Sequence, residues 1–239
     1  MSSAAIIIIG DEILANKFQD DNTPFLLEKC ASLGISVRSV HIIPDVLDRI
    51  ASTVREESAH CDYVFTTGGV GPTHDDITFE GIAQAFDTTL FRHPKLTQLI
   101  ESYTENPTPA AYRMAEVPVE TVLIPTDRGY PQIQVRNVFI FPGVPHLLQS
   151  KFTAIEHLLQ GRTIHRDIVQ LDVRETMIAQ ELTRLDSETP TVKIGSYPRL
   201  KESPSLIITL ESESKTELDR VKAMLEDRFQ PYLHQNKES

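Results

Sequence analysis

The sequence is poor in the residues that mark secreted and membrane proteins. It contains no tryptophan and only two cysteines, Cys30 and Cys61, among 239 residues. Two cysteines are too few for a disulfide framework and favour a reducing compartment. The longest strongly apolar stretch near the start, residues 4–9, is too short to span a bilayer, and no basic segment leading into an apolar one follows Met1. We therefore expect a cytoplasmic protein with no signal peptide and no membrane partner.

Positive charge is also scarce. The chain has 23 lysine and arginine residues against 34 aspartate and glutamate residues, which gives a formal net charge of -11. Such an excess of carboxylates opposes a polyanionic partner, so we expect no nucleic acid to bind. A small phosphorylated ligand remains compatible with this charge, because backbone amides and a metal ion can hold phosphate without a basic surface.

The first two thirds of the chain alternate strand and helix patterns. The run of alanine and isoleucine at residues 4–9 is typical of a strand buried on both faces of a parallel sheet. Asp45 has the position of an N-cap for the helix that follows it. The spacing of apolar residues predicts strands at 4–9, 35–43, 62–67 and 137–141 and helices at 22–33, 46–58, 79–86, 94–103 and 146–159. This order predicts an α/β fold with a doubly wound, mostly parallel sheet and helices on both faces.

A soft boundary near Gly161 separates a second, smaller region. Its pattern predicts a strand at 164–173, a helix at 175–185, strands at 192–196 and 205–210, and a helix at 215–232. This βαββα order suits a small α+β region. We therefore expect two domains, 1–161 and 162–239, with a disordered tail at 235–239.

A glycine-rich loop, residues 66–78, connects a predicted buried strand to a predicted helix. Its glycines, Gly68, Gly69 and Gly71, let backbone N–H groups approach a phosphate without a Cβ atom in the way. Ligands of open α/β sheets bind at the carboxyl ends of the strands, where this loop lies. The loop is neither a Walker A motif nor a G-x-G-x-x-G fingerprint. The alternative is a plain tight turn in which Asp76 or Thr78 caps the helix.

Two adjacent carboxylates, Asp75 and Asp76, lie in the same loop. Their charges would repel a bound phosphate unless a cation lies between them, and a divalent ion bound by carboxylate and phosphate oxygens removes that conflict. The alternative is that one aspartate caps the helix and the other is solvated.

Two further loops also follow predicted strands. Asp11 and Glu12 come directly after the first strand, with Asn22 shortly beyond them as a ligand contact or a helix N-cap. Gly143 follows the strand at 137–141. Because carboxyl ends of parallel strands meet at one edge of a sheet, we expect these loops to converge on the glycine-rich loop.

Taken together, these segments resemble a known family. Residues 10–14, Asp20, Asn22, and residues 67–80 and 141–145 resemble the molybdopterin-binding (MoaB/Mog-like) domain, in the form found in CinA proteins and in the N-terminal half of eukaryotic FAD synthases. Residues 135–143 and 195–198 are more similar to FAD synthases than to CinA. The resemblance covers nearly the whole chain. Asn16 stands where relatives often carry glycine, which asparagine tolerates if its φ is positive.

The resemblance implies a MoaB/Mog-like domain that assembles as a homo-oligomer and has one of two activities. The first is metal-dependent hydrolysis of a pyrophosphate bond in FAD or a related dinucleotide such as ADP-ribose, releasing AMP. Its expected cofactors are a divalent metal, either Mg²⁺, Mn²⁺ or Co²⁺, and K⁺. The second is binding of a pterin phosphate in molybdenum cofactor metabolism. A non-catalytic nucleotide-binding scaffold is a third interpretation.

For the hydrolase we assign roles to the loop residues. Asp76, Asp75 and Glu12 are the catalytic candidates, with Glu12 positioning water as a general base. Asp76 and Asp11 are the metal candidates. The predicted phosphate and ligand contacts are Gly68, Gly69, Gly71, Thr73, Thr78, Asn22 and Gly143.

Overall fold

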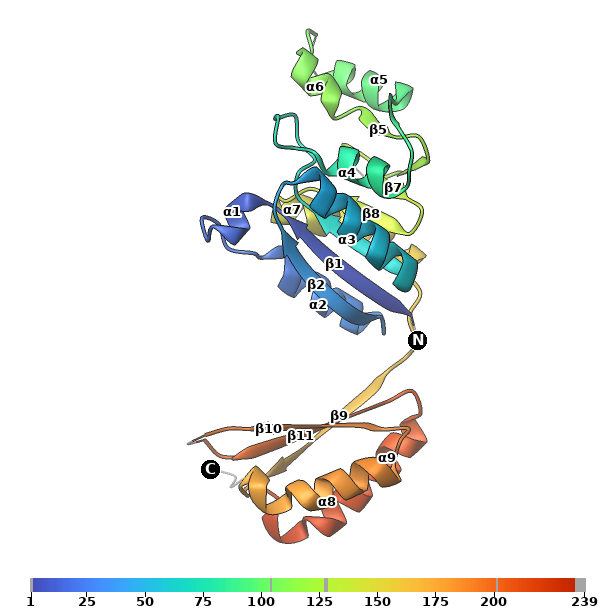
Figure 1. The fold of residues 1–239 in the computed structure, drawn as a ribbon. Coiled ribbons are helices and arrows are strands. Elements are labelled where there is room, and N and C mark those ends of the chain that lie inside the picture. The colour runs from blue at the N-terminus through green and yellow to red at the C-terminus, as the bar shows by residue number, and fades with distance from the viewer. Residues whose placement is uncertain (1, 104, 127–128, 201, 235–239) are drawn as a thin grey trace. The chain divides into compact units, whose positions relative to one another are not determined.

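A computed structural model describes residues 2–103, 105–126, 129–200 and 202–234 (Figure 1). The tail predicted to be disordered, 235–239, lies outside these residues. The chain divides into two compact units, Met1–Gly161 and Arg162–Ser239, which are described separately below. Over the described ranges, no helix combines the length and the apolar character needed to cross a membrane.

The first unit is built on a six-stranded sheet with the strand order β2-β1-β3-β8-β7-β6. The pairs β2–β1, β1–β3 and β3–β8 are parallel, whereas β7 pairs antiparallel with both β8 and β6. A separate antiparallel pair is formed by β4 and β5. The strands are β1 (Ser3–Ile9), β2 (Ser36–Ile43), β3 (Tyr63–Thr67), β4 (Leu90–Arg92), β5 (Glu116–Pro118), β6 (Thr121–Ile124), β7 (Gln132–Val135) and β8 (Val138–Phe141).

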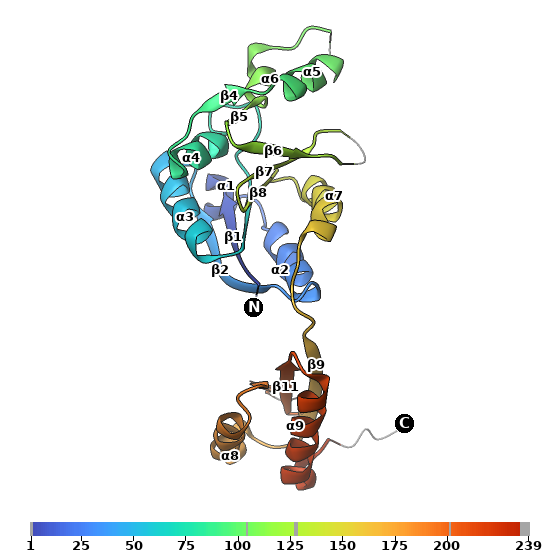
Figure 2. The same ribbon diagram turned by 90° about the vertical axis from the view of Figure 1, so that its right-hand side faces the viewer.

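Helices cover both faces of this sheet (Figure 2). Side chains alternate along β1, so that Ile7 and Ile9 join one buried cluster with α3 and α4, while Ile6 and Ile8 join a second with α2 and α7. This alternation explains why residues 4–9 are apolar throughout. The helices of the unit are α1 (Asp11–Leu14), α2 (Asn22–Ser32), α3 (Leu47–His60), α4 (Thr78–Ala85), α5 (Pro94–Tyr103), α6 (Pro109–Arg113) and α7 (Pro145–Ile155), followed by the short 3₁₀ helix η1 (Glu156–Leu158).

The predicted doubly wound, mostly parallel fold is confirmed, and each predicted strand and helix is present with ends that differ by a few residues. The predicted N-cap at Asp45 is wrong. Helix α3 follows Val46 in the N-cap position, and no side chain caps it. Asp45 instead accepts a hydrogen bond from the Asp11 amide at 2.9 Å, because the ends of β1 and β2 lie side by side.

The second unit has its own sheet, in the order β10-β11-β9, in which both pairings are antiparallel. Helices α8 and α9 lie on the same side of this sheet (Figure 1), and they share one buried cluster with it. Its elements are β9 (His165–Leu171), α8 (Glu175–Glu188), β10 (Lys193–Pro198), β11 (Leu206–Ser212), α9 (Lys215–Arg228) and the 3₁₀ helix η2 (Gln230–Tyr232). The predicted βαββα order is confirmed.

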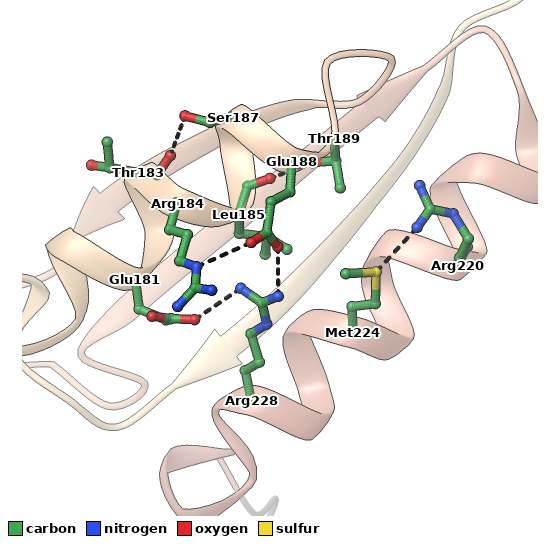
Figure 3. A network of polar contacts seen from close by, with 10 residues as sticks. All are labelled: Glu181, Thr183, Arg184, Leu185, Ser187, Glu188, Thr189, Arg220, Met224 and Arg228. Carbon is green, nitrogen blue, oxygen red and sulfur yellow. Dashed lines mark hydrogen bonds and ion pairs between the residues drawn. The ribbon is translucent and has the colours of Figure 1, made fainter.

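A small ion-pair network links the two helices of this unit (Figure 3). Arg228 of α9 donates to Glu181 and Glu188 of α8 at 2.8 and 2.6 Å, and Arg184 also donates to Glu188, at 3.0 Å. These side chains lie at the surface, where solvent screens an ion pair and leaves it at most about 1 kcal/mol. Burial of apolar side chains between the helices and the sheet therefore dominates the stability of this unit.

Replacing a buried leucine in α9 should cost far more than removing its ion pairs. Leu225 is fully buried, so Leu225→Ala should lower the free energy of unfolding by about 2–5 kcal/mol. Arg228→Ala should lower it by less than about 1 kcal/mol. Denaturant titration of the full chain, followed by circular dichroism, measures both. An Arg228→Ala cost equal to that of Leu225→Ala would contradict this ranking.

In the first unit, the end of β3 approaches the end of β1 so closely that only glycine fits at position 68. A Cβ atom on Gly68 would lie 2.0 Å from the carbonyl oxygen of Ile9, and the residue has a φ of +103°. The Gly68 amide also donates to the carbonyl of Phe141 at 3.2 Å, which ties the end of β3 to the end of β8.

We expect Gly68→Ala to force these strand ends apart. The positive φ alone should cost roughly 1–3 kcal/mol, and the contact with Ile9 adds to it because neither partner is a flexible side chain. Thermal denaturation should show a lower melting temperature than for Gly143→Ala, whose Cβ would meet its nearest atom at an ordinary 3.5 Å. Equal melting temperatures for the two variants would refute the close approach.

Candidate functional site

A cavity of about 1150 Å³ opens at the carboxyl ends of β1, β3 and β8. Cavities that hold small ligands usually measure about 300–1,000 Å³, so this one has room for a ligand as large as a dinucleotide. The loops predicted to converge do so here. The residues that line it are Ile8, Ile9, Glu12, Ile13, Phe18, Gln19, Asp20, Asp21, Asn22, Thr67, Gly68, Gly69, Val70, Gly71, Asp76, Phe79, Ile100, Tyr103, Met114, Tyr130, Pro131, Ile133, Ile140, Pro142, Gly143, Val144, Pro145, Leu147 and Lys151.

The glycine-rich loop forms part of the cavity wall. Thr78 is fully buried, and its hydroxyl donates to the carbonyl of Gly68 at 2.8 Å while its amide donates to Gly69. Thr78 therefore holds the loop and does not reach a ligand. The Gly68 amide is engaged by Phe141, so its predicted contact with phosphate does not fit the structure. The part of the loop that fits a phosphate cradle is Gly69 to Gly71.

Asp76 is tied to its own loop. Its Oδ2 accepts hydrogen bonds from the amide of Thr73, at 2.8 Å, and from the Thr73 hydroxyl. Helix α4 has Ile77 as its N-cap and no side-chain cap, so the alternative in which Asp76 or Thr78 caps this helix is wrong. Asp76 lines the cavity, whereas Asp75 is exposed and is not among the described lining residues.

Asp45 brings a further carboxylate to the glycine loop. Its Oδ1 lies 3.3 Å from the position that a Cβ on Gly69 would occupy. Burial raises the pKa of Asp45, and the charges of Glu12, Asp11 and Asp75 raise it further, against the opposing hydrogen bond from the Asp11 amide. The sequence analysis gave Asp45 a capping role. Its position just after a predicted parallel strand was the signal that could have placed it at the site.

The carboxylates do not by themselves form a metal cage. In the described part of the chain, no group of three or more His, Cys, Asp or Glu side chains is placed to hold a metal ion. Asp45 nevertheless lies close enough to Glu12 and Asp11 for their charges to raise its pKa, and a cation among these carboxylates would offset that repulsion. This donor set fits an ion such as Mg²⁺, which proteins commonly bind through one or two carboxylates together with the phosphates of a ligand.

Asn22 holds two of the loops together. Its amide nitrogen donates to Thr67 Oγ1 at 3.0 Å and to the carbonyl of Gly143 at 2.8 Å. Both N–H groups of the amide are therefore occupied, while Oδ1 is buried and lacks a partner among the described residues. Asn22 does not act as the N-cap of α2. Asp20 Oδ1 accepts from the amides of Asn22 and Thr23 and satisfies the start of that helix.

The first loop folds back over the cavity. Glu12 lies on α1, and its carboxylate is 2.6 Å from where a Cβ on Gly10 would be, so the side chain covers Gly10 and lines the cavity. Asp11 is not among the described lining residues, and its amide is held by Asp45. Asn16, just after α1, has a φ of 53°, so the positive φ considered for this asparagine is present.

Two basic side chains that were not predicted from the sequence support the cavity, Lys151 in its lining and Arg113 behind the glycine loop. Lys151 of α7 donates from Nζ to the carbonyls of Tyr130 and Pro131 at 2.6 and 2.7 Å, and burial lowers the pKa of Lys151 to about 8. Arg113 of α6 donates to the carbonyl of Asp76 at 3.2 Å and thus supports the glycine loop. Both contacts join segments far apart in the sequence, and no local pattern marks them.

Comparison with known proteins agrees with this architecture. The family described as a probable molybdopterin binding domain matches residues 5–161, and the family described as the middle domain of FAD synthase matches residues 163–238. A protein of Archaeoglobus fulgidus is 33% identical over 195 residues, covering 81% of this chain and 85% of that protein.

Two further relatives are a probable FAD synthase and a CinA protein. A probable FAD synthase of Caenorhabditis elegans is 30% identical over 258 residues, covering 94% of this chain but 49% of that protein, so the chain spans about half the length of this relative. The crystal structure of the protein CinA of Thermoplasma acidophilum, titled as of unknown function, superposes with a TM-score of 0.62 at 29% identity, covering 66% of this chain and 99% of that one.

The resemblance seen in the loops is therefore confirmed over most of the sequence. The chain belongs to the family of probable molybdopterin-binding (MoaB/Mog-like) domains and is related to CinA-like proteins and FAD synthases.

Proposed function

We propose that this protein hydrolyses the pyrophosphate bond of FAD or a related dinucleotide such as ADP-ribose. Water adds to one phosphorus, the bridging P–O bond breaks, and AMP leaves together with FMN or ribose phosphate. The observation that supports this most directly is a cavity of about 1150 Å³ whose lining combines the glycines of the loop with the carboxylates of Glu12 and Asp76.

The phosphates would lie against the loop from Gly69 to Gly71. Gly69 and Gly71 line the cavity. A Cβ on Gly69 would lie 2.5 Å from the hydroxyl of the buried Thr78, so the packing beneath the loop requires glycine at this position. Backbone amides at the start of a helix favour negative charge, and α4 begins a few residues farther on.

Asp76 and Asp11, the predicted metal candidates, would hold a divalent cation, either Mg²⁺, Mn²⁺ or Co²⁺, together with phosphate oxygens, and the charge of Asp45 would lie beside Asp11. A metal held by these residues would supply positive charge that stabilises the leaving phosphate, and K⁺ would be an additional cofactor. Glu12 lines the cavity beside this group and would accept the proton of the attacking water. Asp75 would contribute through its charge, because it is exposed.

Binding of a pterin phosphate is the second candidate. It is supported by the family whose description names molybdopterin and which matches residues 5–161. The same glycine loop would hold the phosphate of the pterin. Retention of molybdopterin without turnover of any dinucleotide would favour this function.

A homo-oligomer is also proposed, because the edge strand β2 leaves Val40 and Ile42 exposed at 41% and 44%. An unpaired edge with alternate apolar residues favours pairing with a second copy. Light scattering should give a mass above the 26.9 kDa of one chain, and Ile42→Lys should shift it toward the monomer. A wild-type mass of one chain at tens of micromolar protein would contradict this proposal.

The hydrolase is tested by release of AMP. Wild-type protein is incubated with FAD, ADP-ribose and NAD, each with Mg²⁺, Mn²⁺ or Co²⁺, with and without K⁺. We expect metal-dependent release that EDTA abolishes and that Asp45→Asn and Asp76→Ala each reduce by about 100-fold or more, since both changes remove charge beside the phosphates.

Asp48→Asn is the matched control, because Asp48 is an exposed residue of α3 that contacts Gln84 and is not a lining residue. It should retain wild-type activity. Absence of AMP release from every substrate in a folded sample would reject the hydrolase, and so would full activity in both carboxylate variants.

A further inference from the structure

Lys151 is the single basic side chain among the described residues that line the cavity. It lies six residues after the start of α7, which places its Cα about 9 Å along the helix axis from Pro145 and the strand ends. The wall around it is apolar or aromatic, with Tyr130, Ile133 and Leu147 beside it in the lining. A methionine side chain would pack against these residues as well as the lysine side chain does, so packing alone does not explain a charged group at position 151.

The ammonium group is only partly satisfied by the protein. An ammonium has three N–H donors, and those of Lys151 are used by two backbone carbonyls, Tyr130 at 2.6 Å and Pro131 at 2.7 Å. In the described part of the chain, no carboxylate pairs with Lys151, and burial lowers its pKa to about 8. The ammonium also lies 5.4 Å from the centre of the Tyr130 ring, and one N–H donor is left without a hydrogen-bond acceptor among the described residues.

The surroundings favour a flat heterocycle over a phosphate at this end of the cavity. Two carbonyl oxygens already face the ammonium and would repel a phosphate dianion. The aromatic rings of Tyr130 and Tyr103 and the side chain of Met114 line the same region and suit the faces of a planar ring. The phosphates have their own place on the glycine loop, so a two-ended ligand would extend from that loop toward Lys151.

We propose that Lys151 is a specificity-determining residue that donates its remaining hydrogen bond to a ring carbonyl oxygen of a flat heterocycle, such as the dione edge of a flavin. This inference rests on the proposed binding of a dinucleotide in the same cavity. It adds that the cavity distinguishes ligands by the group attached beyond the pyrophosphate, because ADP-ribose carries only a sugar there.

The test compares two probes that share the adenosine diphosphate portion. Dissociation constants of FAD and ADP-ribose are measured by calorimetry in EDTA, which prevents metal-dependent turnover. We expect Lys151→Met to weaken FAD binding by at least about tenfold and ADP-ribose binding by less than about twofold, since only the flavin loses a hydrogen bond to a charged donor. The absorption spectrum of bound FAD should also change between wild type and variant.

Lys29→Met is the matched control, because Lys29 pairs with Glu156 at 3.3 Å at the other end of α7 and is not a lining residue. Both affinities should stay at wild-type values in this variant. Lys151→Gln, which keeps N–H donors for the two carbonyls, provides a second variant if Lys151→Met does not fold.

Equal losses for FAD and ADP-ribose would overturn the role of Lys151, as would unchanged FAD binding in the Lys151 variants or no FAD binding by the wild-type protein. These outcomes are separate from failure of the hydrolase, because they are read from binding and not from AMP release.

Discussion

Backbone-to-backbone contact among the ends of three strands shapes the cavity of this protein. Gly68 lies against the carbonyl of Ile9 with no room for a Cβ, and its amide is bound by Phe141. Asn22 then joins the same region by donating to Thr67 and Gly143. Because these contacts fix β1, β3 and β8 relative to one another, the three loops that follow the strands form one wall.

The cavity combines two chemical environments. Beside the glycine loop, Glu12 and Asp76 line the cavity and Asp45 lies close to Gly69, so this end would suit a cation together with the phosphates that accompany it. At the other end, Lys151 is set among apolar and aromatic side chains. A ligand with a pyrophosphate at one end and a planar group at the other matches both environments, which is why we favour a dinucleotide over a simple phosphate ester.

The small second unit has a different architecture from the first. Its three-stranded sheet carries helices on one side, its core is its own, and the ion pairs of Arg228 add a surface link between those helices. All described residues that line the cavity belong to the first unit. The second unit matches the middle domain of FAD synthase.

The sequence by itself determined the order of the elements, the mostly parallel sheet and the loops where the chemistry lies. The apolar run of β1 and the glycines after β3 are local signals, and the physical requirements behind them, two buried faces and a tight turn, act on neighbouring residues. Thr78 and Gly68 were correctly placed in the loop but given the wrong partners, because their hydrogen-bonding capacity is used by backbone carbonyls and amides of the folded chain.

Only the tertiary structure decided which side chains face the ligand from distant segments. Asp45 reaches the glycine loop because β2 pairs with β1, and Lys151 reaches the cavity because α7 packs beside the start of β7. Neither contact is predicted by the spacing of apolar residues in the sequence. Strand register and helix packing depend on contacts throughout the core. The distance in space between two residues far apart in the sequence therefore cannot be predicted from the local sequence around either of them.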